Sequence, residues 1–416
     1  MKVLICSYSD TEGGAARAAF KHFQALLAFG VDAEFWSAKY RFNKSGMYYK
    51  SSRVSTLANF VKRQIARLII RICSTNSGPF KSLGLFSAID IRDINQSDFD
   101  VVNLHWVCGE FLSVRDIANI SKPMVWTLHD MWVFLGIEHY QGDGTVESFC
   151  RGNEDPYVNA SSSRLAMWAW LRKFQLWQKP IPLVLSSRWM LGKVQASSMV
   201  SKWPSSIIPN AIDLNIYREI EVGYARHKFK LPLDKKIVLF GAAGGLSDLR
   251  KGGDLLLEAM EVVASQVPEA HLVVFGGVNN LPVDAPNCSF EITNLGPISD
   301  GSLLPLLYSA ANILAVPSRE DNLPLTAVEA HACGCPIVAF DIAGLKDIVE
   351  NGVTGFLTPA FDPGEFGVAI SRILLSSELE GRKLRSDCRI RAEKLWSNDA
   401  VVPMYLKAYE HSITIR

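Results

Sequence analysis

The stretch that decides the fold is residues 313–341, which read ILAVPSREDNLPLTAVEAHACGCPIVAFD. An apolar run at 313–318 is followed by a polar loop, a helical pattern over 325–332 and a second apolar run at 336–341. Runs that are apolar on both faces and separated by a helix predict neighbouring parallel strands covered by helices. The stretch therefore predicts one β-α-β unit of a doubly wound α/β fold.

The same alternation continues through the whole chain. Further apolar runs that predict strands lie at 2–6, 31–37, 100–106, 123–129, 182–186, 236–242 and 271–277, with helical patterns at 15–29 and 254–267 among them. Two such series predict two doubly wound, Rossmann-like domains. We expect these at 1–209 and 210–399, with a C-terminal helix over 400–416 that packs back on the first. Because ligands of such folds bind at the carboxyl ends of the strands, we expect the site in a central cleft that both domains face.

Composition excludes several classes of protein. With 416 residues, 48% hydrophobic and 20% charged, the chain is not disordered, collagen-like or a coiled coil. A net charge of +1 argues against nucleic acid as a partner. The eight cysteines are scattered, the start lacks a signal-peptide pattern, and no apolar run approaches the roughly 18 residues that span a bilayer. These features predict a cytoplasmic protein.

Charge is unevenly divided along the chain. Residues 1–205 hold 24 Lys and Arg against 16 Asp and Glu, whereas the remainder holds 19 against 26. Two stretches, 35–89 and 156–212, contain no acidic residue at all. Within them, 54–73 and 164–174 read as basic helices with apolar and aromatic residues, which suit an anionic membrane surface. The alternative is that their apolar stripes pack on the first domain while the cations are merely solvated.

Three short motifs lie where predicted strands end and predicted helices follow. Gly13 and Gly14 would let backbone N–H groups approach an anion, or would form a tight turn that only packs. His129 ends a predicted strand and would point into the ligand crevice, although a lone His is more often structural. Arg250 and Lys251, before a helix, suit a diphosphate, or else form a solvated basic loop.

Two carboxylates lie eight residues apart in the stretch that decides the fold. Asp321 falls in the polar loop, and Glu329 falls about one turn into the helix, with Pro324 in the first turn. Glu329 has apolar neighbours in sequence, and an acid in such a setting usually needs a partner. Two ribose hydroxyls that donate hydrogen bonds to the carboxylate would provide such a partner.

Together these motifs carry a resemblance that covers nearly the whole chain. They are Gly13-Gly14, His129-Asp130, Pro209-Asn210-Ala211-Ile212-Asp213, Arg250-Lys251-Gly252, the pair Asp321 and Glu329, and Ala332-Cys333-Gly334-Cys335-Pro336. In this order they resemble the family 4 retaining glycosyltransferases of GT-B fold, and the variant E-D-N-L-P resembles a subgroup associated with surface polysaccharides. The resemblance implies hexosyl transfer from a nucleotide-sugar donor, with retained configuration and without a metal or other cofactor.

The resemblance also implies roles for single residues. His129 and Asp321 would act at the reacting centre on the donor sugar, and Glu329 would hold the ribose. The remaining donor-binding residues would be Gly13, Gly14, Arg250, Lys251, Asn322, Leu323 and Leu325. The family usually has Glu at position 321, so Glu320 is a substitute acid, and Pro324 stands where many members have Gly.

Other interpretations remain open on sequence alone. The acceptor would be a glycan or a lipid-linked saccharide, with the protein peripheral on the cytoplasmic face of the membrane. A catalytically silent nucleotide-sugar-binding subunit and a GT-B nucleotide-sugar epimerase are the alternatives, whereas an NAD enzyme is disfavoured because G-x-G-x-x-G is absent. A zinc site is disfavoured because the spacings fit no compact pattern among His105, Cys108, His129, His139 and Cys150. The nucleotide, sugar, acceptor, linkage and oligomeric state are not determined.

Overall fold

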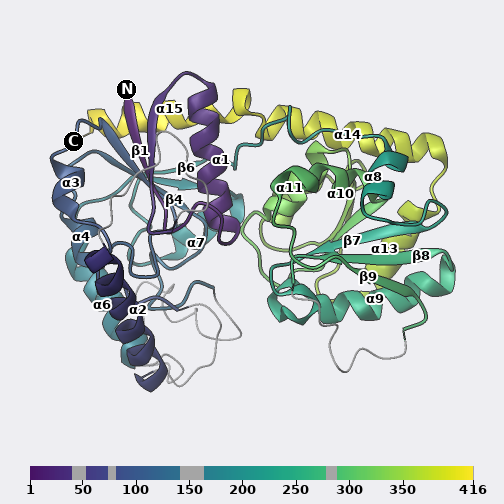
Figure 1. The fold of residues 1–416 in the computed structure, drawn as a ribbon, viewed down its shortest axis with the longest axis horizontal. Coiled ribbons are helices and arrows are strands. Elements are labelled where there is room, and N and C mark those ends of the chain that lie inside the picture. Colours follow the sequence, from purple (N-terminus) through teal and green to yellow (C-terminus); the bar gives the residue numbers. More distant parts are fainter. Residues whose placement is uncertain (40–52, 74–80, 141–163, 278–287, 416) are drawn as a thin grey trace. The chain divides into compact units, whose positions relative to one another are not determined.

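The computed structural model describes residues 1–39, 53–73, 81–140, 164–277 and 288–415 (Figure 1). The chain divides into two compact units, Met1–Pro209 with Val402–Arg416, and Asn210–Val401. Within the described ranges, each unit has one six-stranded sheet in which all pairings are parallel. The prediction of two doubly wound α/β domains is confirmed.

The sheet of the first unit has the strand order β2-β1-β3-β4-β5-β6. Its strands are β1 (Lys2–Cys6), β2 (Asp32–Trp36), β3 (Val101–Leu104), β4 (Met124–Leu128), β5 (Leu183–Leu185) and β6 (Ser205–Ile207). Its helices are α1 (Gly14–Ala28), α2 (Arg53–Cys73), α3 (Ile91–Asn95), α4 (Val114–Ala118), α6 (Arg164–Leu176) and α7 (Arg188–Ala196). The chain runs from β1 outward to β2 and then returns to β3 on the other side of β1. The strand order therefore reverses at β1 and β3.

The C-terminal helix α15 (Asn398–Thr414) packs on the first unit with most of its length. Tyr405 and Tyr409 are buried, and the hydroxyl of Ser412 donates to the backbone oxygen of Met124 over 2.8 Å. The end of the chain is thus tied to the middle of the first sheet.

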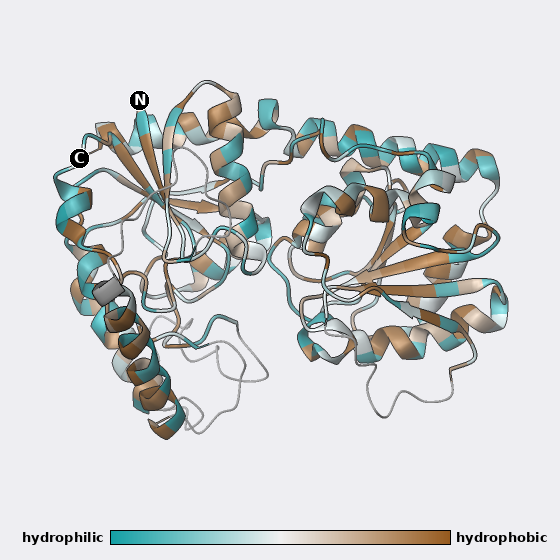
Figure 2. Cartoon of the chain, viewed as in Figure 1, coloured by the Kyte–Doolittle hydropathy of each residue, from teal (hydrophilic) through white to brown (hydrophobic). Residues whose placement is uncertain are grey.

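The sheet of the second unit has the order β12-β11-β10-β7-β8-β9. Its strands are β7 (Lys236–Gly241), β8 (Ala270–Phe275), β9 (Glu291–Asn294), β10 (Ile313–Val316), β11 (Ile337–Phe340) and β12 (Gly355–Thr358). Its helices are α8 (Val222–Lys228), α9 (Gly253–Gln266), α10 (Leu304–Ala310), α11 (Leu325–Ala332), α12 (Leu345–Ile348), α13 (Pro363–Leu374) and α14 (Glu378–Trp396), with short 3-10 turns at Gly245–Ser247, Leu249–Lys251 and Gly301–Leu303. Here the order reverses at β7 and β10. Apolar central strands, brown in Figure 2, pack against α9 and α13.

The sequence missed three edge strands, β6, β9 and β12. Each is the last strand at one edge of its sheet, and β6 (Ser-Ser-Ile) and β9 (Glu-Ile-Thr-Asn) have few apolar residues. An edge strand is not buried on both faces, so it lacks the continuous apolar run by which a central parallel strand is recognised. One local detail also differs: Pro324 is the residue before α11, not part of its first turn.

Candidate functional site

The predicted diphosphate and sugar residues of the second unit lie together where its strand order reverses. The loop after β7 carries Arg250 and Lys251, and the loop after β10 carries Asp321. The ammonium of Lys251 forms an ion pair with Oδ2 of Asp321, and Nη1 of Arg250 lies 3.9 Å from the same oxygen. Open parallel sheets bind their ligands at such a reversal. Two motifs that are 70 residues apart in sequence therefore form one charged cluster.

Backbone contacts hold these two loops against each other. Nη1 of Arg250 donates to the backbone oxygen of Glu320 over 2.8 Å, and the N–H of Arg319 donates to that of Arg250 over 2.8 Å. Gly252 has φ +73°, and a Cβ there would lie 1.9 Å from the backbone oxygen of Pro317. Only glycine satisfies both conditions. In this cluster the side chain of Asp321 contacts Lys251, whereas Glu320 contributes its backbone oxygen to the contact with Arg250.

Glu329 lies in the fifth position of α11 and is buried. The hydroxyl of Tyr308, on α10, donates to its Oε2 over 2.7 Å. The sequence predicted that an acid here needs a partner and did not find Tyr308, which stands in an apolar helical stretch without any motif. A carboxylate can accept several hydrogen bonds, so this contact leaves capacity for ligand hydroxyls.

The start of α11 adds backbone donors beside Asp321. Leu325 is the first helical residue, and the first four N–H groups of a helix have no partner within it. Asn322 and Leu323 are buried in the loop that precedes it. Such a helix start favours a negatively charged ligand group.

Gly13 and Gly14 lie at the start of α1, next to the reversal point of the first sheet. Gly13 precedes the helix with φ +90°, a conformation that favours glycine, and Gly14 is the first helical residue. A Cβ added at either position would meet no atom within 4 Å. The space beside both glycines is open, as close approach of a ligand requires.

Replacing Gly14 by alanine separates packing from ligand approach. Its φ is ordinary and its surroundings are open, so we expect Gly14→Ala to leave the free energy of unfolding unchanged or raise it by less than about 1 kcal/mol. If a phosphate approaches this backbone, the added methyl group should weaken donor binding about tenfold or more. Urea unfolding and donor titration measure the two effects; equal donor affinity in both proteins would contradict the predicted role.

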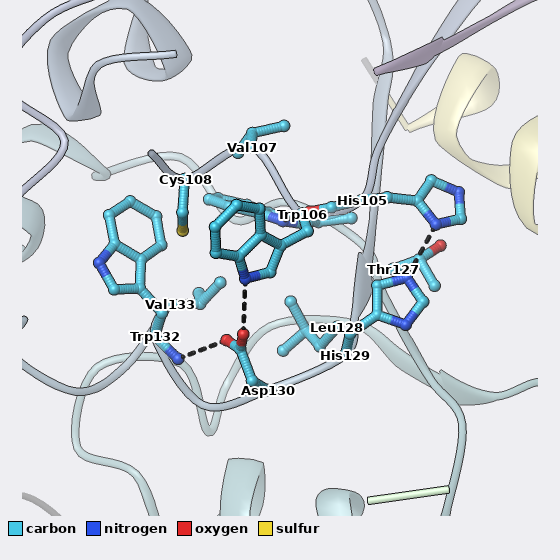
Figure 3. A pocket seen from close by; sticks show the side chains of 11 residues that line it. His105, Trp106, Val107, Cys108, Thr127, Leu128, His129, Asp130, Trp132 and Val133 are labelled. Carbon is cyan, nitrogen blue, oxygen red and sulfur yellow. Dashed lines mark hydrogen bonds between the residues drawn. The ribbon is translucent and has the colours of Figure 1, made fainter. Parts of the chain in front are cut away.

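His129 follows β4 and shares a small pocket with Trp106 and Asp130 (Figure 3). Its Nε2 lies 2.9 Å from Nδ1 of His105, a buried residue that follows β3. Burial lowers the pKa of His129 to about 4, so the ring is neutral at pH 7. The sequence considered His105 only as a metal ligand, because its place beside His129 depends on strand pairing.

Asp130 is held by a separate set of donors. Its carboxylate accepts from the indole of Trp106 (2.9 Å), the N–H of Trp132 (3.0 Å) and Nδ1 of His139 (2.7 Å). Burial alone would raise the pKa of Asp130, but His139 and these donors lower it below its usual value. His139 also contacts Oγ of Ser82 over 2.9 Å. Asp130 thus stabilises the conformation of the loop that follows His129.

The residues considered for zinc separate into different environments. His105 pairs with His129, His139 pairs with Asp130, and Cys108 is a buried thiol. Cys150 lies outside the described residues. Among the described residues, no group of three or more His, Cys, Asp or Glu side chains is arranged to hold a metal ion.

Buried histidines should make the protein less stable in acid. Burial lowers the pKa of His129 to about 4 and those of His22 and His331 to about 3, from about 6.5. Between pH 6.5 and 4 the unfolded chain therefore binds more protons than the folded one, so stability is full above pH 6.5 and is lost as the pH falls. We expect a loss of about 1.4 kcal/mol per pH unit for each such histidine.

Urea unfolding at a series of pH values measures this dependence. His331→Phe keeps a ring against Trp396 and removes one titrating group, so the decline should become shallower in this variant. An identical pH dependence in both proteins would contradict the assignment.

Comparison with known proteins agrees with this geometry. Residues 236–376 match the model of the family described as "Glycosyl transferases group 1". The matched residues lie within the second unit, which is therefore similar to this family over most of its length. The region matched includes Arg250, Lys251, Asp321 and Glu329, so the charged cluster lies inside the part of the chain that matches the family.

Several relatives are similar in sequence to about half of this chain. D-inositol 3-phosphate glycosyltransferases of Mycobacterium bovis and Mycobacterium tuberculosis strains are 32% identical over 216 residues, which are 49% of this chain and 43% of theirs. The match thus spans less than half the length of these relatives.

Two solved structures share the fold of the whole chain. Sucrose-phosphate synthase from Thermosynechococcus elongatus has a TM-score of 0.65 at 18% identity and covers 100% of both chains. HepE of Anabaena, in complex with UDP-glucose, has a TM-score of 0.64 at 15% identity and covers 99% of this chain and 100% of its own. The fold is therefore that of GT-B glycosyltransferases, as the sequence resemblance implied.

Proposed function

We propose that this chain is a retaining, metal-independent glycosyltransferase of the hexosyl type. It moves a sugar from a nucleotide-sugar donor to a glycan or lipid-linked saccharide acceptor in polysaccharide biosynthesis. The observation that carries the proposal is the cluster of Lys251, Arg250 and Asp321 beside the start of α11, within the part of the chain that matches the family.

Each part of this cluster suits one part of the donor. The ammonium of Lys251, with Arg250 beside it, offers positive charge to a diphosphate and stabilises it as it leaves. An ammonium has three donors, so Lys251 can keep Asp321 while it binds phosphate. Asp321 accepts hydrogen bonds from sugar hydroxyls, and the N–H groups of Leu323 and Leu325 face sugar or phosphate.

Other residues complete the proposed donor site. The buried carboxylate of Glu329, oriented by Tyr308, accepts from the ribose hydroxyls. Gly13 and Gly14 approach the phosphate, and His129 contacts the donor sugar. Retention follows if the acceptor hydroxyl attacks on the face that the diphosphate leaves, with the leaving phosphate taking its proton; we assign no protein base.

A panel of nucleotides and donors tests the proposal. UDP, GDP, ADP and TDP are compared by thermal shift, since a ligand that binds the folded state raises its apparent stability. UDP comes first because the Anabaena HepE structures contain UDP and UDP-glucose. The matching donor is then followed for release of free sugar or transfer. Binding without turnover would indicate a silent subunit, and conversion of the donor to its epimer without acceptor would indicate an epimerase.

We further propose that the protein works at the cytoplasmic face of a membrane, bound through α2. Leu57, Val61, Ile65, Leu68 and Ile72 form one stripe along this helix, and each is between 42% and 73% exposed. The opposite face packs on α6 through Ala66. In Figure 2 the free face of α2 shows apolar residues between hydrophilic ones. Exposed arginines beside the stripe suit anionic lipid headgroups.

Residues 164–174 fit this proposal less well. Both interpretations of this stretch, membrane binding and solvation, place its cations at the surface, but Lys173 is fully buried in α6. Its ammonium donates to three backbone oxygens, those of Trp132, Leu135 and Gly136. That expectation is wrong because those three carbonyls stabilise the buried ammonium. Within the described residues, no helix is both long and apolar enough to cross a membrane.

Co-sedimentation with vesicles tests the role of α2. We expect binding to vesicles rich in phosphatidylglycerol at low salt and about tenfold weaker binding after Ile65→Ser with Leu68→Ser, because two exposed apolar contacts are lost. Leu379→Ser is the matched control, since Leu379 is 79% exposed on α14. Equal binding by all three proteins, or none by the wild type, would rule out the surface.

A further inference from the structure

A chain of polar groups runs from His129 into the interior of the first unit. Nε2 of His129 lies 2.9 Å from Nδ1 of His105, and Nε2 of His105 lies 3.0 Å from Oδ1 of Asn103. The hydroxyl of Tyr409, on α15, donates to the same oxygen over 2.8 Å and lies 2.7 Å from Nε2 of His22. The four residues beyond His129 are buried, whereas His129 is partly exposed. The chain thus links a buried network to a side chain that is partly exposed.

The direction of these hydrogen bonds follows from one backbone carbonyl. The amide of Asn103 lies 3.1 Å from the backbone oxygen of Val125 and 3.0 Å from Oγ1 of Thr127. Because a carbonyl oxygen can only accept, the atom of Asn103 that faces Val125 must be its nitrogen. The opposite orientation would set two carbonyl oxygens against each other in the core. Oδ1 of Asn103 therefore faces His105 and Tyr409 and accepts from both.

His105 must then carry its proton on Nε2. Burial lowers the pKa of His105 well below its usual value, so the ring is neutral at pH 7 and has a single N–H. Its Nδ1 is an acceptor, and the 2.9 Å contact is a hydrogen bond only if Nε2 of His129 donates. Since His129 is also neutral at pH 7, its Nδ1 carries a lone pair. Figure 3 shows this contact between the two rings.

We propose that His105 is a positioning residue that holds His129 as the Nε2–H tautomer, so that His129 meets its ligand through Nδ1 as a hydrogen-bond acceptor. A sugar hydroxyl can donate to this nitrogen, whereas a phosphate oxygen cannot. His129 therefore recognises a hydroxyl of the donor sugar. The identity of the ligand rests on the proposed function; the tautomer does not.

Nitrogen-15 NMR of the full chain labelled at histidine tests the tautomer directly. Two-bond correlations between ring nitrogens and carbon-bound protons show which nitrogen carries the proton. The resonances of His129 are identified by their loss in His129→Gln. We expect a protonated Nε2 and an unprotonated Nδ1 from pH 6 to 8. A protonated Nδ1 in the wild type would overturn the proposal.

Three variants separate positioning from a merely structural role. His105→Phe keeps a ring and removes the acceptor, so His129 should become a mixture of tautomers, with kcat lowered about 10- to 100-fold and KM little changed. His105→Asn restores an oxygen near the place of Nδ1 and should restore the Nε2–H tautomer and most of kcat. Tyr409→Phe disturbs the same network but leaves the hydrogen bond from His105 to Asn103, so His129 should remain the Nε2–H tautomer.

The outcomes distinguish a failure of this proposal from a failure of the proposed function. An unchanged tautomer in His105→Phe, or equal loss of kcat in His105→Phe and Tyr409→Phe without a change of tautomer, would overturn the positioning role. If His105→Phe does not fold, the wild-type spectrum and His105→Asn still decide. The expected tautomer in a protein that transfers no sugar would support the assignment of His105 and refute the proposed function alone.

Discussion

Replacing Lys251 by methionine is expected to lower kcat for sugar transfer about 10²- to 10³-fold. The ammonium faces Asp321 where the strand order of the second sheet reverses, and the proposed function assigns it to the leaving diphosphate. Loss of one preorganised group that stabilises developing charge typically costs this much. Methionine keeps the length of the side chain, so packing changes little. Steady-state kinetics with the donor found in the nucleotide panel measure the effect.

Two controls distinguish lost chemistry from lost stability. Lys251→Met leaves the buried carboxylate of Asp321 without its ammonium partner, which destabilises the fold. Adding Asp321→Asn removes that charge and should restore the melting temperature without restoring kcat. Lys346→Ala, which breaks the exposed ion pair to Asp341, should change neither quantity. A kcat near the wild-type value in Lys251→Met would refute the assignment of Lys251.

Replacing Glu329 by glutamine is expected to weaken nucleotide binding about 10- to 100-fold. A hydrogen bond to a charged group contributes about 1.5–3 kcal/mol, and the carboxylate is proposed to accept from two ribose hydroxyls. Glutamine has the same shape and still accepts from Tyr308, so the packing of α11 on α10 is kept. Calorimetric titration with the nucleoside diphosphate chosen from the panel measures the loss.

The 2′-deoxy form of the same nucleotide makes this test specific. The wild type should prefer the ribonucleotide at least tenfold, and Glu329→Gln should lose most of that preference. Tyr308→Phe removes the donor to Oε2 but leaves the carboxylate, so it should keep the preference with a smaller loss of affinity. Unchanged preference in Glu329→Gln would show that the carboxylate does not bind ribose.

The sequence predicted the central strands well, for a local reason. The strand expected at residues 2–6 and the helix expected at 325–332 have those bounds in the structure. A strand buried on both faces must be apolar throughout, and its pattern shows this. The charged residues and the glycine of Arg250-Lys251-Gly252 are likewise adjacent in sequence, so this motif can be recognised without the fold.

Contacts between side chains of elements distant in sequence could not be predicted in this way. Tyr308 reaches Glu329 from another helix, and His105 reaches His129 from the neighbouring strand end. Nothing in the residues around Tyr308 or His105 marks them, because each contact depends on how the elements pack. The burial of Lys173 could not be predicted for the same reason, because the carbonyls that bind its ammonium lie 37 to 41 residues away in sequence.

The sequence by itself thus determined the doubly wound fold, the two domains' central strands and the charged loops at the second sheet's reversal point. These follow from hydrophobic periodicity and from short motifs, both of which are local properties of the chain. Only the tertiary structure decided which groups face each other. It pairs Lys251 with Asp321, gives Glu329 its hydroxyl donor and, through Val125 and Asn103, sets which nitrogen of His129 carries the proton. Hydrogen-bond direction is a property of neighbours in space, and the fold alone brings those neighbours together.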